Sequence, residues 1–184
     1  MKILHIDSSI NGTNSVTRDI SRRVVDRLTA QNPDAHVVYR DLSAWPLTHL
    51  TLDAFADSSV VDEFLDSDVI VIGAPMYNFG IPSTLKAWID RIAIAGKTFR
   101  YTANGPEGLA GGRRVFIASS RGGYYGANTP TAAFEHQESH LRAVFGLMGV
   151  TDLTFVHAEG VNYGPDVRAQ AIETARGEVL KLAA

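Results

Sequence analysis

The run of four β-branched residues at 69–72 constrains this fold most, because of the loop into which it leads. A short run of this kind is typical of a parallel strand buried on both faces of a sheet. The following loop, between two prolines, offers aromatic surface from Tyr77 and Phe79 and an amide from Asn78. A tight strand-to-helix connection would explain the prolines but not the aromatics. Ligands of open α/β sheets bind beyond the carboxyl ends of the strands, so we expect this loop to contact a flat ligand with polar edges.

Strand and helix patterns alternate along the whole sequence. Besides the strand that begins at residue 69, we predict strands over residues 2–7, 36–42, 114–119 and 153–158. Helices are predicted over residues 15–30, 53–66, 131–148 and 166–182, and from Ser83 onwards. Such alternation implies right-handed crossovers and a parallel sheet with helices on both faces. The predicted fold is one α/β domain over residues 1–184, flavodoxin-like, with five parallel strands in the order 2-1-3-4-5.

The composition limits the partners and the chemistry. A net charge of -3 argues against a broad nucleic-acid surface, because phosphate binding needs a basic face. The chain has no cysteine, which excludes disulfides, thiolate catalysis and Cys-ligated metal centres. No apolar run is long enough to span a bilayer, and the first residues lack the pattern of a signal peptide. We expect a cytoplasmic protein that acts on small molecules, with neither nucleic acid nor membrane as a partner.

The loop after the first predicted strand has the composition of a phosphate site. Residues 8–18 carry hydroxyl and amide side chains and lead into a helix amino terminus, where unpaired N–H groups favour an anion. Arg18 is close enough in sequence to help neutralise that anion. The simpler interpretation is a helix cap made by Asn14 or Ser15, because the segment lacks the glycine and lysine pattern of a P-loop.

The loop after the fourth predicted strand contains two consecutive glycines, Gly122 and Gly123, followed by Tyr124 and Tyr125. Such glycines let backbone amides approach a ligand closely and form an anion-binding concavity. Amides aimed at a flavin ring would stabilise the negative charge that appears when the ring is reduced. A flexible glycine turn is the alternative. Because the first, third and fourth loops open at one edge of the sheet, we favour a flavin site.

In these loops the sequence resembles the FMN-dependent NADH-azoreductases of the flavodoxin-like quinone reductase superfamily. The matching motifs are APMYNF at 74–79, TFRYT at 98–102, GPEG at 105–108, SRGG at 120–123 and AEG at 158–160. The resemblance implies phosphate and ribityl contacts of FMN at Ser9, Ser15, Val16 and Thr17. It implies contacts to the flavin ring at Met76, Tyr77, Asn78, Phe79, Ser120, Arg121, Gly122 and Gly123. It also implies a homodimer with the flavin near the subunit boundary, and a substrate cleft lined by Tyr101 and Tyr125.

The function implied by the resemblance is a two-step, ping-pong hydride transfer. NADH or NADPH reduces FMN, and a quinone or an azo compound is then reduced in the same place, with protons available from solvent. The segment between Leu42 and Val60 is shorter than in many members of the family, where the corresponding insert can shape the cleft and so the substrate range. Thr17 stands where serine is frequent, a change that keeps the hydroxyl. One alternative is a flavodoxin-type electron carrier without an NADH site, although such carriers tend to be more acidic than -3. Another is a non-catalytic flavin or nucleotide sensor.

Metal and hydrolase chemistry are not expected. His136 and His140 stand four residues apart on a predicted helix, but the segment lacks the residue order of a zinc protease motif. The sequence also contains no GxSxG nucleophile elbow. We expect Trp88 to lie in the core or in a dimer contact, and His5 and His157 to be packed or paired within strands.

Overall fold

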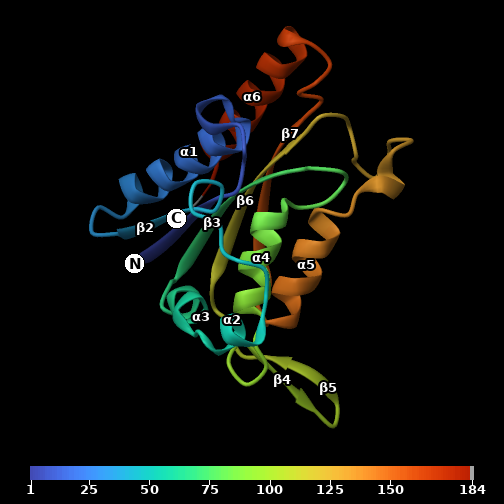
Figure 1. The fold of residues 1–184 in the computed structure, drawn as a ribbon. Helices are drawn as coiled ribbons and strands as arrows, with labels where there is room; N and C mark the ends of the chain where they lie inside the picture. Colours follow the sequence, from blue (N-terminus) through green and yellow to red (C-terminus); the bar gives the residue numbers. More distant parts are fainter. Residues whose placement is uncertain (183–184) are drawn as a thin grey trace.

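The computed structural model describes residues 1–182 and is built around a parallel sheet (Figure 1). Its five strands run in the order β2-β1-β3-β6-β7. Their bounds are β1 (Lys2–Asp7), β2 (His36–Asp41), β3 (Val69–Pro75), β6 (Arg114–Arg121) and β7 (Asp152–Glu159). When the two strands of a separate hairpin are left out of the count, this is the predicted order 2-1-3-4-5, and the predicted flavodoxin-like sheet is confirmed.

The central strand β3 shows why the sheet needs cover on both faces. All seven of its residues are buried, and the first four alternate between two apolar clusters. Val69 and Val71 pack in the cluster that contains residues of α1 (Val16–Gln31) and α6 (Pro165–Val179). Ile70 and Ile72 pack in the cluster on the other face, with residues of α3 (Ser59–Leu65), α4 (Ser83–Ile92) and α5 (Glu138–Leu147). The period of two along a strand therefore assigns each helix to a layer.

Two predicted helices are each interrupted in the structure. Residues 53–66 form α2 (Leu52–Ala56) and α3 instead of one helix, because the backbone is extended at Asp57, whose carboxylate accepts the N–H of Ser59. Residues 131–148 form a 3-10 helix (Ala132–Phe134) and then α5. There the carboxylate of Glu135 accepts the N–H groups of Gln137, which precedes α5, and of the first two residues of the helix, Glu138 and Ser139.

An antiparallel hairpin, which the sequence did not predict, joins β4 (Phe99–Thr102) to β5 (Gly105–Gly108). It projects from the end of the sheet opposite the carboxyl ends of the strands (Figure 1). A Cβ on Gly108 would overlap the backbone of Gly149, just before β7, so the hairpin base fits closely there. No helix within residues 1–182 combines the length and the apolar character needed to cross a membrane.

Candidate functional site

The carboxyl ends of β1, β3 and β6 bring the three predicted loops to one small polar cavity of about 170 Å³. It is lined by seven of the twelve residues predicted to hold the cofactor: Ser9, Ser15, Val16, Met76, Tyr77, Ser120 and Gly122. The remaining lining residues are Asn11, Pro75, Val161, Asn162 and Arg168. Hydroxyl, amide and guanidinium groups thus surround the cavity, and no carboxylate is among these lining residues. This donor set fits the phosphate and the polyhydroxy chain of FMN.

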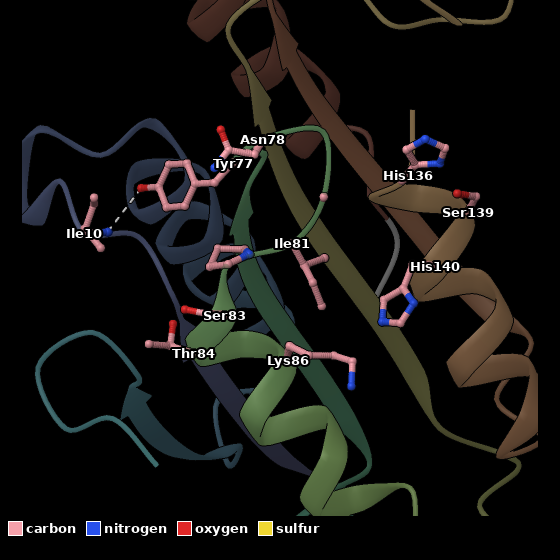
Figure 2. Close-up of a pocket in the computed structure, with 12 residues that line it drawn as sticks. Ile10, Tyr77, Asn78, Ile81, Ser83, Thr84, Lys86, His136, Ser139 and His140 are labelled. Atoms are coloured by element: carbon pink, nitrogen blue, oxygen red, sulfur yellow. Dashed lines mark hydrogen bonds between the residues drawn. The ribbon is translucent and has the colours of Figure 1, made fainter. Parts of the chain in front are cut away.

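The first loop enters the cavity through a short 3-10 helix (Gly12–Asn14) and the amino terminus of α1. Ser15 caps α1, because its hydroxyl accepts the N–H of Arg18 at 3.3 Å. Thr17 is fully buried and lies 3.1 Å from the Ser15 hydroxyl, so it supports the cap and does not line the cavity. The phenol of Tyr77 accepts the N–H of Ile10 at 3.2 Å, which joins this loop to the second one (Figure 2).

The Arg18 side chain does not line the small cavity and is paired with Asp41 instead. Its guanidinium donates two hydrogen bonds to Asp41, at 2.6 and 2.8 Å, and one to the carbonyl of Ser9 at 2.9 Å. The hydrogen bonds from Arg18 hold the pKa of the Asp41 carboxyl below its ordinary value, so both groups are charged at neutral pH. Arg18 therefore holds the first loop in place, and it does not line the cavity where an anion was predicted.

The second loop has an unusual backbone. Asn78 and Phe79 have φ values of 49° and 71°, in the left-handed region that side chains other than glycine rarely adopt. Strain of this kind is frequent where a loop presents side chains to a ligand. Met76 donates its N–H to the carbonyl of Ser120 at 2.8 Å, which ties the second loop to the third.

A larger cavity of about 1020 Å³ lies beside the second loop, between α4 and α5 (Figure 2). Tyr77 and Asn78 line it, together with Ile10, Gly80, Ile81, Pro82, Ser83, Thr84, Lys86, His136, Ser139 and His140. Burial lowers the pKa of His140, so this imidazole is neutral at pH 7. Within residues 1–182 no group of three or more His, Asp or Glu side chains is placed to hold a metal ion.

An aromatic cluster adjoins the second loop. Phe79 does not line either of these cavities but stacks on Phe134, with ring centroids 5.2 Å apart, and meets the edge of Tyr125 at 6.1 Å. The structure thus brings Tyr125, a predicted cleft residue, beside a predicted ring contact.

In the third loop the side chain of Arg121 is turned away from the cavity. It is 3% exposed and lies within 3.4 Å of three carboxylates, those of Glu135, Glu138 and Glu159. Burial alone would raise the pKa of Glu138, but hydrogen bonds from Arg142 and His157 outweigh it and lower that pKa. Arg121 lines neither cavity, and its carbonyl accepts the N–H of Val161 at 3.1 Å.

The two glycines of the third loop differ in what they face. Gly122 lines the small cavity, and a Cβ there would lie 2.5 Å from the Asn162 side chain, so a larger residue would displace that amide. Gly123 does not line it and packs against the ring of Tyr125 instead. Gly160 donates its N–H to the carbonyl of Gly123 at 3.0 Å, and Asn162 donates its N–H to the carbonyl of Gly122 at 3.1 Å. The segment after β7 is thus part of the site.

Tyr101 is the predicted site residue that lies apart from the rest. It is 77% exposed and stands on β4, in the hairpin at the opposite end of the sheet (Figure 1). Within one chain it lines neither cavity.

Sequence reasoning missed Asn162 and Arg168, which line the small cavity. A signal was present, because the Gly164-Pro165 pair marks the start of a helix and so places Arg168 in its first turn.

Residues 1–183 match a protein-family model described as a flavodoxin-like fold. FMN-dependent NADH:quinone oxidoreductase 2 of Bradyrhizobium diazoefficiens is 55% identical, with 95% of each chain covered. FMN-dependent NADH:quinone oxidoreductase 1 of Xanthomonas euvesicatoria pv. vesicatoria is 56% identical, with 95% of this chain and 93% of that relative covered. Among solved structures, an azoreductase from Bacillus anthracis has a TM-score of 0.90 at 27% identity, with 98% of this chain and 97% of that chain covered.

Proposed function

This chain belongs to the family of FMN-dependent NADH:quinone oxidoreductases with a flavodoxin-like fold, and we propose that it reduces quinones and azo compounds with electrons from NADH. The hydride chemistry is supplied by FMN when it is bound, while the protein provides position and electrostatics. The observation that carries the proposal is the small cavity, where seven predicted residues from three distant loops meet among hydrogen-bond donors.

In this proposal the small cavity holds the phosphate and ribityl chain, and the second and third loops hold the ring. Ser9 and Ser15 offer hydroxyls, and the amino terminus of α1 adds its partial positive charge. Asn78 presents an amide at the larger cavity, and Phe79 follows it in the same loop, where its ring stacks on Phe134. That cavity has apolar walls at Ile81 and Pro82, which suits the flat ring of a nicotinamide or a quinone.

The homodimer is part of the same proposal. If Tyr101 serves a substrate cleft, a second chain must bring it there, because in one chain it lies at the far end of the sheet. A cytoplasmic location is also proposed, and the absence of cysteine supports it. The alternative of an electron-carrier flavodoxin has no support from the relatives, which are named as NADH:quinone oxidoreductases at 55% and 56% identity.

The deciding experiment is anaerobic addition of NADH to the FMN-loaded protein, followed by a quinone or an azo dye. We expect rapid loss of the yellow flavin absorbance and its return when the acceptor is added. A parallel titration with NADPH ranks the two donors, and the ratio of rates with the two acceptors identifies the better substrate class. Bound FMN that NADH does not bleach would contradict the reductase, and a protein that binds no FMN would contradict the site.

A further inference from the structure

Arg168 reaches the small cavity from the opposite end of the sequence. It lies in the first turn of α6, which runs beside α1 on one face of the sheet (Figure 1). Its Nη2 donates a hydrogen bond to the carbonyl of Asn14 at 3.1 Å, at the entry to α1. Its side chain lines the cavity together with Ser9 and Ser15. A guanidinium group is thereby placed where the first loop meets the amino terminus of α1.

The charge of Arg168 is not neutralised by the protein around it. Within residues 1–182 no ion pair involves Arg168, whereas Arg18 is paired with Asp41 and Arg22 with Asp19. The residues that line the cavity include no carboxylate. The cavity therefore combines one uncompensated cation with hydroxyl donors and a helix amino terminus, which together favour a doubly charged oxyanion.

We propose that Arg168 binds the phosphate of FMN and gives this site a preference for FMN over riboflavin. The inference rests on the proposed function, because it takes the flavin to lie at this cavity. Arginine suits the task because its planar fork can donate two parallel hydrogen bonds to phosphate oxygens. The bond to Asn14 holds that fork at the cavity before the ligand arrives, which reduces the ordering cost of binding.

The test compares FMN with riboflavin, which has the same ring and ribityl chain but no phosphate. Apoprotein is titrated with each flavin, and the quenching of flavin fluorescence gives the dissociation constant. Arg168→Gln removes the charge, and Arg168→Lys keeps the charge but loses the fork. Arg27→Gln is the control with the same change of charge, because it stands about 18 Å further along α1 than Ser15. The melting temperature of each apoprotein shows that the variants are folded at the titration temperature.

We expect Arg168→Gln to raise the FMN dissociation constant roughly 10- to 100-fold, while that for riboflavin stays within about twofold. Arg168→Lys should fall between the wild type and Arg168→Gln. Arg27→Gln should bind both flavins as the wild type does. Added salt should weaken FMN binding more in the wild type than in Arg168→Gln, because salt screens the attraction that this variant lacks.

Equal weakening of FMN and riboflavin by Arg168→Gln would overturn the inference, since Arg168 would then only brace the loop through Asn14. Unchanged binding of both flavins would overturn it as well. If Arg168→Gln does not fold, the test uses Arg168→Lys and compares its ratio of FMN to riboflavin dissociation constants with that of the wild type. An unchanged ratio would contradict the proposal. A wild-type protein that binds neither flavin contradicts the proposed function itself, which is a distinguishable result.

Discussion

Gly73, at the end of β3, shows how closely single residues are constrained beneath the site. A Cβ on Gly73 would overlap Oδ1 of Asp7, which is 3% exposed. That carboxylate cannot move aside easily, because it accepts hydrogen bonds from Ser21 at 2.8 Å and Tyr39 at 3.1 Å. Burial and the nearby Asp7 raise the pKa of Tyr39 to about 12, so the phenol keeps its proton and remains a donor.

We therefore expect Gly73→Ala to lower the free energy of unfolding by about 2 kcal/mol, through overpacking against Asp7. Gly177→Ala is the matched control, because Gly177 lies inside α6 with no atom within 4 Å of a new Cβ. That variant should gain about 0.5–1 kcal/mol, since alanine is the better helix former. Urea unfolding measures both changes. Equal stability of the two variants would show that the Asp7 carboxylate can move away from the new Cβ without a loss of unfolding free energy.

At the scale of elements, Gln137 connects the ends of two strands with the start of α5. Its side chain is fully buried, and its Nε2 donates to the carbonyl of Ala74, in β3, at 2.8 Å. Its Oε1 accepts from Ser119 at 2.7 Å and from Arg121 at 3.3 Å, both in β6. One amide thus holds the two strand ends from which the second and third loops start.

Replacement of Gln137 by Met keeps the volume but leaves three buried polar groups without their partner. We expect a loss of roughly 3 kcal/mol in the free energy of unfolding, measured in urea. Hydrogen exchange should also become faster at the N–H of Met76, which bonds to the carbonyl of Ser120 between the two loops. The control is Gln170→Met on the exposed side of α6, with an expected change within about 0.5 kcal/mol. Unaltered exchange at Met76 would contradict the coupling of the loops.

At the scale of the whole molecule, the candidate site and the β4–β5 hairpin occupy opposite ends of the sheet (Figure 1). If Tyr101 serves the proposed substrate cleft, a second chain must therefore bring it there. In a symmetric dimer each site would combine the loops of one chain with Tyr101 of the other.

Mixing two variants tests this arrangement. Tyr101→Ala and Gly122→Val should each lower quinone reduction, because one alters the proposed cleft and the other displaces Asn162 at the cofactor cavity. Unfolding and refolding an equal mixture should restore intact sites to about a quarter of the wild-type number, because random pairing gives half mixed dimers with one intact site each, and activity should rise accordingly. Each variant refolded alone is the control. If sedimentation shows dimers but the mixture recovers no activity, Tyr101 does not contribute to the site of the other chain.

Local patterns were enough to predict five parallel strands, and the known order of flavodoxin-like folds then predicted the edge at which three loops meet. The buried run at 69–72 and the alternation of elements carry that information, because burial on both faces and right-handed crossovers leave few topologies. What these patterns describe is each segment and its neighbours along the chain.

Only the tertiary structure decided which side chains face the site. The side chain of Arg18 pairs with Asp41, and that of Arg121 pairs with three glutamates. Arg168 contacts the first loop at Asn14, which is 154 residues away in the sequence. The physical reason is that a charged side chain adopts the direction in which its partners satisfy it, and those partners are distant in sequence. Each strand is encoded by a pattern within its own segment, whereas the direction of each charged side chain depends on pairings between segments.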